Sequence, residues 1–259
     1  MRLDGRVAIV TGGGKGLGRA ISLALAKEGA DVVVAARTET ALKEVASEIE
    51  AMGRKSLAVV TDLTDPEQPL ALVNQALEKF GRIDVLVNNS GIEGPTVSVA
   101  DMDLEGWNQV LAVNLTGTML CAKYVLRSMI PRQSGNIINI SSGAGRWGFG
   151  LRSPYSVSKW GVISLTQSMA REVGRYGIRV NCIAPGPVEG ERIERVYRDR
   201  SQATGQTIEE VMESDKAKAA LYRLVKPEEV AALAVFLASE ESSGMTGQTI
   251  NCSAGYSMN

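Results

Sequence analysis

The sequence contains no histidine, and this absence excludes several common kinds of site. Ser-His-Asp triads, histidine-ligated metals and histidine proton shuttles all need the imidazole ring. Acid–base chemistry must therefore rest on Tyr, Lys, Asp, Glu or Cys. The three cysteines, Cys121, Cys182 and Cys252, lie far apart and show no CxxC spacing. They indicate neither a disulfide framework nor a zinc site, and are typical of small core residues in a reducing compartment.

An excess of charge of one sign is also lacking, because 28 Lys and Arg residues face 29 Asp and Glu residues. This balance does not favour nucleic acid as a partner. We find no apolar run that we judge long enough to cross a membrane, and no signal-peptide pattern before the first strand-like segment. We therefore expect a cytoplasmic protein with neither a nucleic-acid nor a membrane partner.

The chain of 259 residues is 44% hydrophobic, which suits one large domain over residues 1–259. Short apolar, β-branched runs alternate with amphipathic helical segments. This alternation predicts an α/β fold: a Rossmann-like, doubly wound parallel sheet of about seven strands with helices on both faces. The predicted strands are Val7–Thr11, Asp31–Ala36, Ser56–Thr61, Val85–Val87, Asn136–Ile140, Ile178–Ile183 and Thr249–Cys252. The predicted helices are Arg19–Gly29, Glu39–Met52, Pro66–Phe80, Leu104–Met129, Tyr155–Tyr176 and Glu228–Ala238.

One stretch, residues 189–225, interrupts the alternation because it is polar and charged. An insertion of this length is either a lid over a site or a disordered segment. We interpret it as a substrate-binding lid that becomes ordered on binding. Its arginines, including Arg192 and Arg195, could meet an anionic group, although such a charge run is more often one solvated helix face.

A glycine-rich loop, Thr11-Gly-Gly-Gly-Lys-Gly-Leu-Gly18, separates the first strand from the first helix. Its spacing fits T-G-x-x-x-G-x-G rather than G-x-G-x-x-G. Glycines allow the backbone to approach a pyrophosphate closely, and the helix N-terminus presents free N–H groups. A tight turn without a ligand is the alternative. The predicted cofactor contacts in the loop are Gly12, Gly14, Lys15, Gly16, Leu17 and Gly18.

The end of the second strand, Ala35-Ala36-Arg37, carries no carboxylate. An acidic residue there would bind the ribose 2′-hydroxyl of NAD, whereas an Arg suits the 2′-phosphate of NADP. Lys15 adds a second cation that should lie nearby. The two cations predict NADP(H) as the preferred cofactor, with NAD(H) possible. The alternative is a pair of solvated surface cations.

Two further segments follow strands, at the sheet edge where ligands bind in such folds. Asp62-Leu63 follows the third strand and can meet the adenine. Asn88-Asn-Ser-Gly91 follows the fourth strand, and we predict cofactor contacts at Asn88, Ser90 and Gly91. The alternative for this second segment is ordinary turn chemistry.

A candidate catalytic group lies at the start of a predicted helix, in Tyr155-Ser-Val-Ser-Lys159. Residues at i and i+4 share a helix face, so the ammonium of Lys159 can lower the pKa of the Tyr155 phenol. That pair provides a general acid/base without histidine. Ser142 at the end of the fifth strand can bind the reacting oxygen. Asn114 lies within an apolar helix, either as a hydrogen-bonded structural residue or at a kink that holds a relay water.

These motifs, in this order, closely resemble the short-chain dehydrogenase/reductase family over essentially the full length. The resemblance also draws on Pro185-Gly186. It implies that Tyr155 is the acid/base, supported by Lys159, with Ser142 orienting the substrate and Asn114 holding the water. It also implies that Tyr155 and Lys159 contact the cofactor, Lys159 at the nicotinamide ribose. Pro185, Gly186 and Val188 would border the nicotinamide. It also implies a homotetramer that pairs helices near 104–130 and 155–176.

The sequence departs from the family pattern at three places. Ser90 replaces the usual Ala of N-N-A-G, and Gly190 stands where a Thr often contacts the cofactor. Ser253-Ala-Gly-Tyr256 replaces the common Asp-Gly-Gly near the C-terminus, so subunit contacts there can differ.

The motifs together predict an oxidoreductase that transfers hydride between NADP(H) and a small carbonyl or secondary alcohol. An NAD(H)-linked dehydrogenase of a sugar, polyol or hydroxy acid is one alternative. A dinucleotide-sensing protein without turnover is another, because fold alone does not fix function. The substrate stays open between a sugar, a 3-oxoacyl thioester, a cyclic ketone and a steroid. Trp147 and Phe149 can form an apolar wall of its pocket, or simply pack in the ordinary way.

Overall fold

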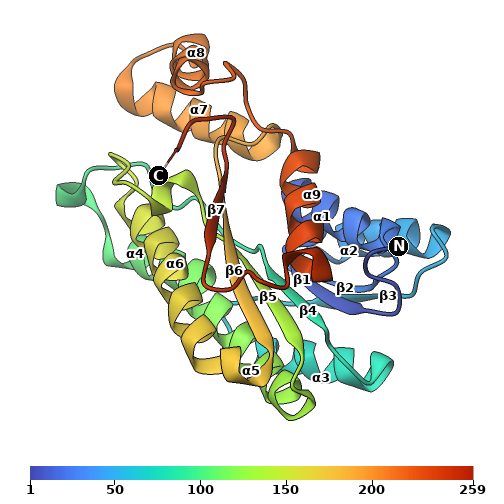
Figure 1. Cartoon of the computed structure of the whole chain (residues 1–259). Coiled ribbons are helices and arrows are strands. Elements are labelled where there is room, and N and C mark those ends of the chain that lie inside the picture. The colour runs from blue at the N-terminus through green and yellow to red at the C-terminus, as the bar shows by residue number, and fades with distance from the viewer. Residues whose placement is uncertain (259) are drawn as a thin grey trace.

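The computed structural model describes residues 1–258 and contains a seven-stranded, wholly parallel sheet. Its strand order is β3-β2-β1-β4-β5-β6-β7, with helices on both faces, as predicted (Figure 1). The strands are β1 (Val7–Thr11), β2 (Asp31–Ala36), β3 (Ser56–Val60), β4 (Val85–Asn88), β5 (Gly135–Ile140), β6 (Ile178–Pro185) and β7 (Thr249–Cys252). The longer helices are α1 (Gly16–Lys27), α2 (Glu39–Ala51), α3 (Gln68–Phe80), α4 (Leu104–Leu111), α5 (Gly117–Arg132), α6 (Ser153–Val173), α7 (Glu191–Thr204), α8 (Ile208–Lys218) and α9 (Pro227–Ala238).

Two apolar layers hold the helices to the sheet, because successive side chains of a strand point to opposite faces. Ala8 and Val10 of β1 belong to a cluster with α1, α2 and α9. Ile9 between them belongs to a second cluster with α3, α5 and α6. Strands buried on both faces explain the continuous Val-, Ile- and Ala-rich runs of the sequence.

The strand order reverses between β1 and β4, which are hydrogen-bonded neighbours. From β1 the chain winds outward to β2 and β3, and from β4 it winds the other way to β5, β6 and β7. Loops leave the sheet in opposite directions at this point, so a crevice forms beyond the carboxyl ends of β1 and β4. Thr11 and Asn88 end these two strands.

The long predicted helix over 104–129 is divided into three parts. A π-helical segment, η2 (Ala112–Thr116), separates α4 from α5, and Asn114 lies at its centre. By length and composition, the helix Leu104–Arg132 could cross a membrane, with a mean hydropathy of 1.2 over its most apolar window. Our judgement that no apolar run reaches that length was therefore wrong. Cys121, Val125 and Met129 of α5 are nevertheless buried in the second apolar cluster against the sheet.

The polar stretch 189–225, which sequence patterns left without elements, contains α7 and α8. The two helices lie together beyond the edge of the sheet where the strands end (Figure 1). Thr207 begins α8 with a capping box. Its side chain accepts from the Glu210 backbone N–H, and the Glu210 carboxylate accepts from the Thr207 backbone N–H. Tyr197 of α7 and Val211 of α8 are buried, and the two helices contact each other.

Candidate functional site

The glycine-rich loop lies between β1 and α1, where the strand order reverses. Gly12 and Gly16 have φ of +66° and +49°, which other residues rarely adopt. A Cβ on Gly18 would lie only 1.9 Å from the Gly12 carbonyl oxygen, so the backbone folds back on itself here. Lys15 begins α1 without a side-chain cap, and the first turn contains no acidic residue. The free N–H groups of this turn therefore suit a phosphate ligand.

The two predicted phosphate-binding cations, Lys15 and Arg37, are both exposed near the loop. Arg37 directly follows β2. Within residues 1–258, neither side chain forms a hydrogen bond or an ion pair, so both are available to a ligand. Arg37 lies close enough to Asp62 to contribute to lowering the pKa of that carboxyl group, although hydrogen bonds from Thr64 lower it more.

Asp62 and Leu63 have different surroundings. The Asp62 Oδ1 atom accepts from the Thr64 backbone N–H at 2.9 Å and from the Thr64 hydroxyl at 2.8 Å. The carboxylate thus forms a turn after β3 and is only partly buried. Leu63 is 7% exposed and packs against Gly117, where a Cβ would lie 2.7 Å from the Leu63 Cβ. Its side chain is a core residue, which leaves its backbone for any ligand contact.

The Asn-Asn-Ser-Gly segment ties β4 to β1 at the crevice. The Thr11 hydroxyl accepts from the backbone N–H groups of Asn89, at 3.0 Å, and Ser90, at 3.1 Å. Asn88 is buried, and its Nδ2 donates to Asn139 Oδ1 at 2.9 Å, so its side chain is turned into the protein. Gly91 faces the predicted catalytic group, because a Cβ on it would lie 3.4 Å from Lys159 Nζ.

Asn114 is fully buried, and its side-chain amide bonds to two neighbouring segments. Its Oδ1 accepts from the Ile92 backbone N–H at 2.8 Å, and its Nδ2 donates to the Ile92 carbonyl at 3.0 Å and to Ser158 Oγ at 3.1 Å. These hydrogen bonds join the helix to the loop after β4 and to α6, as a structural role for Asn114 requires. It also lies in a π-helical turn, the kink expected from the functional interpretation, and such turns are frequent at functional sites.

Ser142, Tyr155 and Lys159 come together at the carboxyl end of β5 and the start of α6. Lys159 Nζ lies 5.8 Å from the centre of the Tyr155 ring and donates to the Ile140 carbonyl at 2.8 Å. Burial raises the pKa of the Tyr155 phenol, but Arg192, Lys159, a hydrogen bond with Ser142 and Arg152 together lower it below its usual value. Burial lowers the pKa of Lys159, and the nearby phenol opposes this.

Two arginines lie beside Tyr155, a contact that the sequence did not predict for either of them. Arg152 directly precedes α6, and its guanidinium carbon lies 5.4 Å from the centre of the Tyr155 ring. Arg192, in the first turn of α7, approaches the same ring to 5.8 Å. Arg192 was expected only as one of several arginines in residues 189–225 that could meet an anionic group, and Arg152 had no predicted role of its own. The contact of Arg192 with Tyr155 and its hydrogen bond to the Gly91 carbonyl distinguish it from the arginines farther along α7.

The segment after β6 passes the same crevice. Gly186 lies against the C-terminal segment, since a Cβ on it would be 2.9 Å from the Ser253 Cα. Val188 pairs with Val225 in a parallel bridge that closes the base of the α7–α8 excursion, while Pro185 ends β6. Gly190 has a φ of +126° and begins α7 without a side-chain cap, so it supplies no hydroxyl to a ligand.

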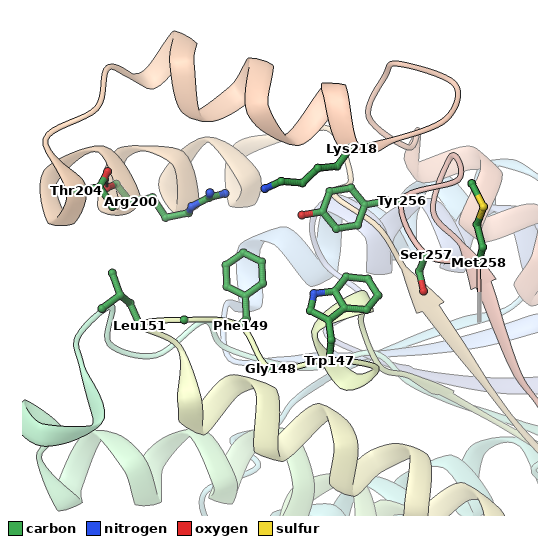
Figure 2. A pocket seen from close by; sticks show the side chains of 11 residues that line it. Trp147, Gly148, Phe149, Leu151, Arg200, Thr204, Lys218, Tyr256, Ser257 and Met258 are labelled. Carbon is green, nitrogen blue, oxygen red and sulfur yellow. Dashed lines mark hydrogen bonds between the residues drawn. The ribbon is translucent and has the colours of Figure 1, made fainter.

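A pocket of about 620 Å³ lies between this excursion and the loop before α6 (Figure 2). Trp147 and Phe149 line one side, as predicted for an apolar wall, and Tyr256 stacks on Trp147 with ring centres 5.7 Å apart. Arg200 and Lys218 lie opposite Trp147 and Phe149 (Figure 2). The pocket also approaches Ser142, because the Trp147 ring that lines it packs on Gly143, the residue after Ser142. The full lining is Trp147, Gly148, Phe149, Gly150, Leu151, Arg200, Thr204, Lys218, Tyr256, Ser257 and Met258.

Comparisons with known proteins agree with this arrangement. The family model described as short chain dehydrogenase matches residues 6–201. A 3-oxoacyl-(acyl-carrier-protein) reductase of Thermotoga maritima is 38% identical over 255 residues, covering 98% of this chain and 99% of that protein. The crystal structure of a NAD⁺-bound xylitol dehydrogenase superposes with a TM-score of 0.95 at 30% identity, covering 97% of this chain and 99% of the other. An actinorhodin polyketide ketoreductase variant with NADPH gives a TM-score of 0.92 at 35% identity, covering 97% of each chain.

Proposed function

The chain belongs to the short chain dehydrogenase family and is an oxidoreductase acting on CH–OH or C=O groups; on that premise we propose that it interconverts a small carbonyl compound and its secondary alcohol with NADP(H), using Tyr155 as acid/base. One observation carries the proposal. Tyr155, Ser142 and Lys159 meet at the crevice beside Gly91, and the surroundings of the phenol lower its pKa. A sensor without turnover has no need of such a group.

The residues around Tyr155 divide the work of proton handling. The bound nicotinamide cofactor supplies the hydride in reduction and accepts it in oxidation. In reduction, Tyr155 Oη donates its proton to the carbonyl oxygen, and in oxidation the phenolate takes the hydroxyl proton back. Lys159 stabilises the phenolate, and the Ser142 hydroxyl hydrogen-bonds the reacting oxygen. Asn114 holds the loop at Ile92 and the π-helical turn in place.

The glycine loop fits a dinucleotide, because its close backbone packing at Gly18 and the uncapped α1 leave N–H groups for the pyrophosphate. Asp62 and the Leu63 backbone would meet the adenine side, and Ser90 and Gly91 the ribose. The Asn88 side chain would not touch the cofactor; its hydrogen bond to Asn139 would hold the end of β4 in place. The remaining proposed contacts are Gly12, Gly14, Gly16, Leu17, Pro185, Gly186 and Val188.

The preference for NADP(H) rests on Lys15 and Arg37, whose side chains have no hydrogen-bond or ion-pair partner within residues 1–258. A planar guanidinium and an ammonium at the adenosine ribose suit a 2′-phosphate. The NAD⁺ bound to the similar xylitol dehydrogenase makes the NAD(H)-linked alternative the one to exclude. Lys15→Ala combined with Arg37→Ala should weaken NADPH binding far more than NADH binding. Equal losses for both cofactors would contradict the phosphate assignment.

A homotetramer is a further part of the proposal. Met119 of α5 and Val157 and Trp160 of α6 are exposed large apolar side chains on the helices expected to pair between subunits. Such apolar area is typical of an interface. Light scattering of the purified protein should give four times the mass of one chain, and a monomer would contradict this arrangement.

The direct test of the proposed function is NADPH consumption on a panel of ketones, 3-oxoacyl thioesters and ketosugars, with Tyr155→Phe alongside. We expect turnover that disappears in Tyr155→Phe, because the phenylalanine keeps the ring and loses only the proton donor. Turnover that survives the substitution would exclude Tyr155 as the acid/base. Tight NADPH binding without turnover on the panel would favour the sensor.

A further inference from the structure

Tyr155 is surrounded by more positive charge than its own acid–base role requires. Lys159 and the guanidinium groups of Arg152 and Arg192 all lie within 5.4–5.8 Å of the centre of its ring. One ammonium group is enough to favour a phenolate. The two guanidinium groups come from different elements, the loop before α6 and the first turn of α7. Their convergence on one ring needs another explanation.

Glu93 is the carboxylate in contact with this group. Its Oε1 lies 3.1 Å from Arg192 Nε and 3.3 Å from Arg195 Nη2. One carboxylate oxygen thus already fits between two arginines of α7. The spacing of Arg192 and Arg195 therefore suits a carboxylate. The single negative charge of Glu93 does not neutralise the two guanidinium groups.

Arg152 adds to the imbalance because it is only 3% exposed. Its Nη2 donates to the Glu93 backbone carbonyl at 3.1 Å, while its Nε has no hydrogen-bond partner among the described residues. Burial lowers the pKa of Arg152, and the Tyr155 phenol, Glu93 and Asp199 partly oppose this lowering. The three cations around Tyr155, together with Arg195 beside Glu93, thus face two carboxylates, Glu93 and Asp199. A buried charge without a partner is costly, so an added anion would stabilise the group.

Arg192 is the cation that a ligand can reach. Its side chain is 43% exposed, and its Nη1 donates to the Gly91 carbonyl at 3.2 Å, at the crevice. Its Nη2 makes no hydrogen bond to any residue in the described part of the chain. A guanidinium held at Nε and Nη1 still offers a planar edge, which matches the two oxygens of a carboxylate.

We propose that Arg192, with Arg195 beside it, binds a carboxylate of the substrate, so that the enzyme acts on a keto acid or hydroxy acid. This inference rests on the proposed function, because it places the acid beside the reacting carbonyl at Tyr155. Arg152 adds a buried positive charge next to the site without contacting the carboxylate. Glu93 orients Arg192 and Arg195 through its ion pairs with them. A neutral sugar or ketone would leave the surplus charge uncompensated.

Binding to the protein saturated with NADPH tests the inference without knowledge of the natural substrate. The probes are cyclohexanecarboxylate and the uncharged cyclohexanecarboxamide, titrated by calorimetry. We expect the carboxylate to bind about tenfold more tightly or better, the effect of one charge-assisted pair. Arg192→Gln should abolish this preference. Arg198→Gln should keep it, because Arg198 lies on the same helix but forms no ion pair or hydrogen bond with residues 1–258.

Titration with NADPH alone distinguishes failure of the proposed function from failure of the carboxylate site. A protein that does not bind NADPH contradicts the proposed function itself. A protein that binds NADPH but shows no preference for the carboxylate, or binds neither probe, overturns the substrate class and leaves the proposed function intact. Equal losses in Arg192→Gln and Arg198→Gln would also overturn it, because the effect would then come from the overall charge of α7.

Discussion

Substitution of Gly18 by alanine tests the shape of the glycine loop most severely. The new methyl group would lie 1.9 Å from the Gly12 carbonyl oxygen and 2.5 Å from Asn89 Nδ2. Because real contacts of this kind are essentially never shorter than 3.0 Å, the loop or the start of α1 must move by about 1 Å. The obstacle is backbone, so no side-chain rotation can relieve it.

Two effects should follow from Gly18→Ala. Overpacking of this kind costs about 1–3 kcal/mol of unfolding free energy, or roughly 2–12 °C in Tm. A shift of about 1 Å in the groups that position the reactants can lower turnover about 100-fold. NADPH binding should weaken as the α1 N–H groups turn away from the pyrophosphate.

Thermal unfolding and NADPH fluorescence titration measure both effects in the same samples. Gly174→Ala is the matched control, because a Cβ there meets nothing within 4 Å and its φ of −57° suits alanine. We expect the control to keep the Tm and the affinity of the original protein. A Gly18→Ala protein with unchanged Tm and unchanged NADPH affinity would refute the described packing of the loop.

Three further substitutions have expected outcomes. Ser142→Ala should lower kcat about 100- to 1000-fold while NADPH affinity is kept, because one donor to the reacting oxygen is lost; steady-state kinetics with a cofactor titration would show this. Asp84→Ala should cost about 1–3 kcal/mol in urea unfolding, since the buried carboxylate accepts from the Val7 backbone N–H at 2.9 Å; no change in midpoint would contradict this role. Arg192→Gln should raise the pKa of Tyr155, because a nearby positive charge is lost. Compared with the original protein, the reduction of a neutral ketone should then fall off at a higher pH, and the oxidation of the alcohol should begin at a higher pH. Unmoved pH profiles would argue against Arg192 acting on the phenol.

The elements of the sheet could be predicted because buried parallel strands have a simple pattern. The predicted strand Val7–Thr11 has the same bounds in the structure, and all five residues are buried. Helix ends were harder, because caps depend on local contacts: α6 begins at Ser153, two residues before Tyr155. The π-helical turn at Asn114 was predicted only as a kink, since hydropathy does not distinguish it from a regular helix.

The α7–α8 excursion shows where sequence patterns fail. Tyr197 is the only buried residue of α7, so the helix lacks the apolar stripe by which helices are identified. Its docking depends instead on ion pairs such as Arg192 with Glu93, which join residues about a hundred positions apart. The sequence motifs predicted that Tyr155, Lys159 and Ser142 form one catalytic group. The charge around them became visible only in three dimensions.

Transfer of deuterium tests the central claim most directly. The protein is incubated with NADPH deuterated at nicotinamide C4, on each face in turn, and with a reducible keto acid, and the alcohol formed is analysed by mass spectrometry. We predict that one of the two labelled cofactors transfers its deuterium to the alcohol carbon, and that Tyr155→Phe forms no labelled alcohol although it still binds NADPH. Labelled product formed equally well by Tyr155→Phe would contradict the account of this site.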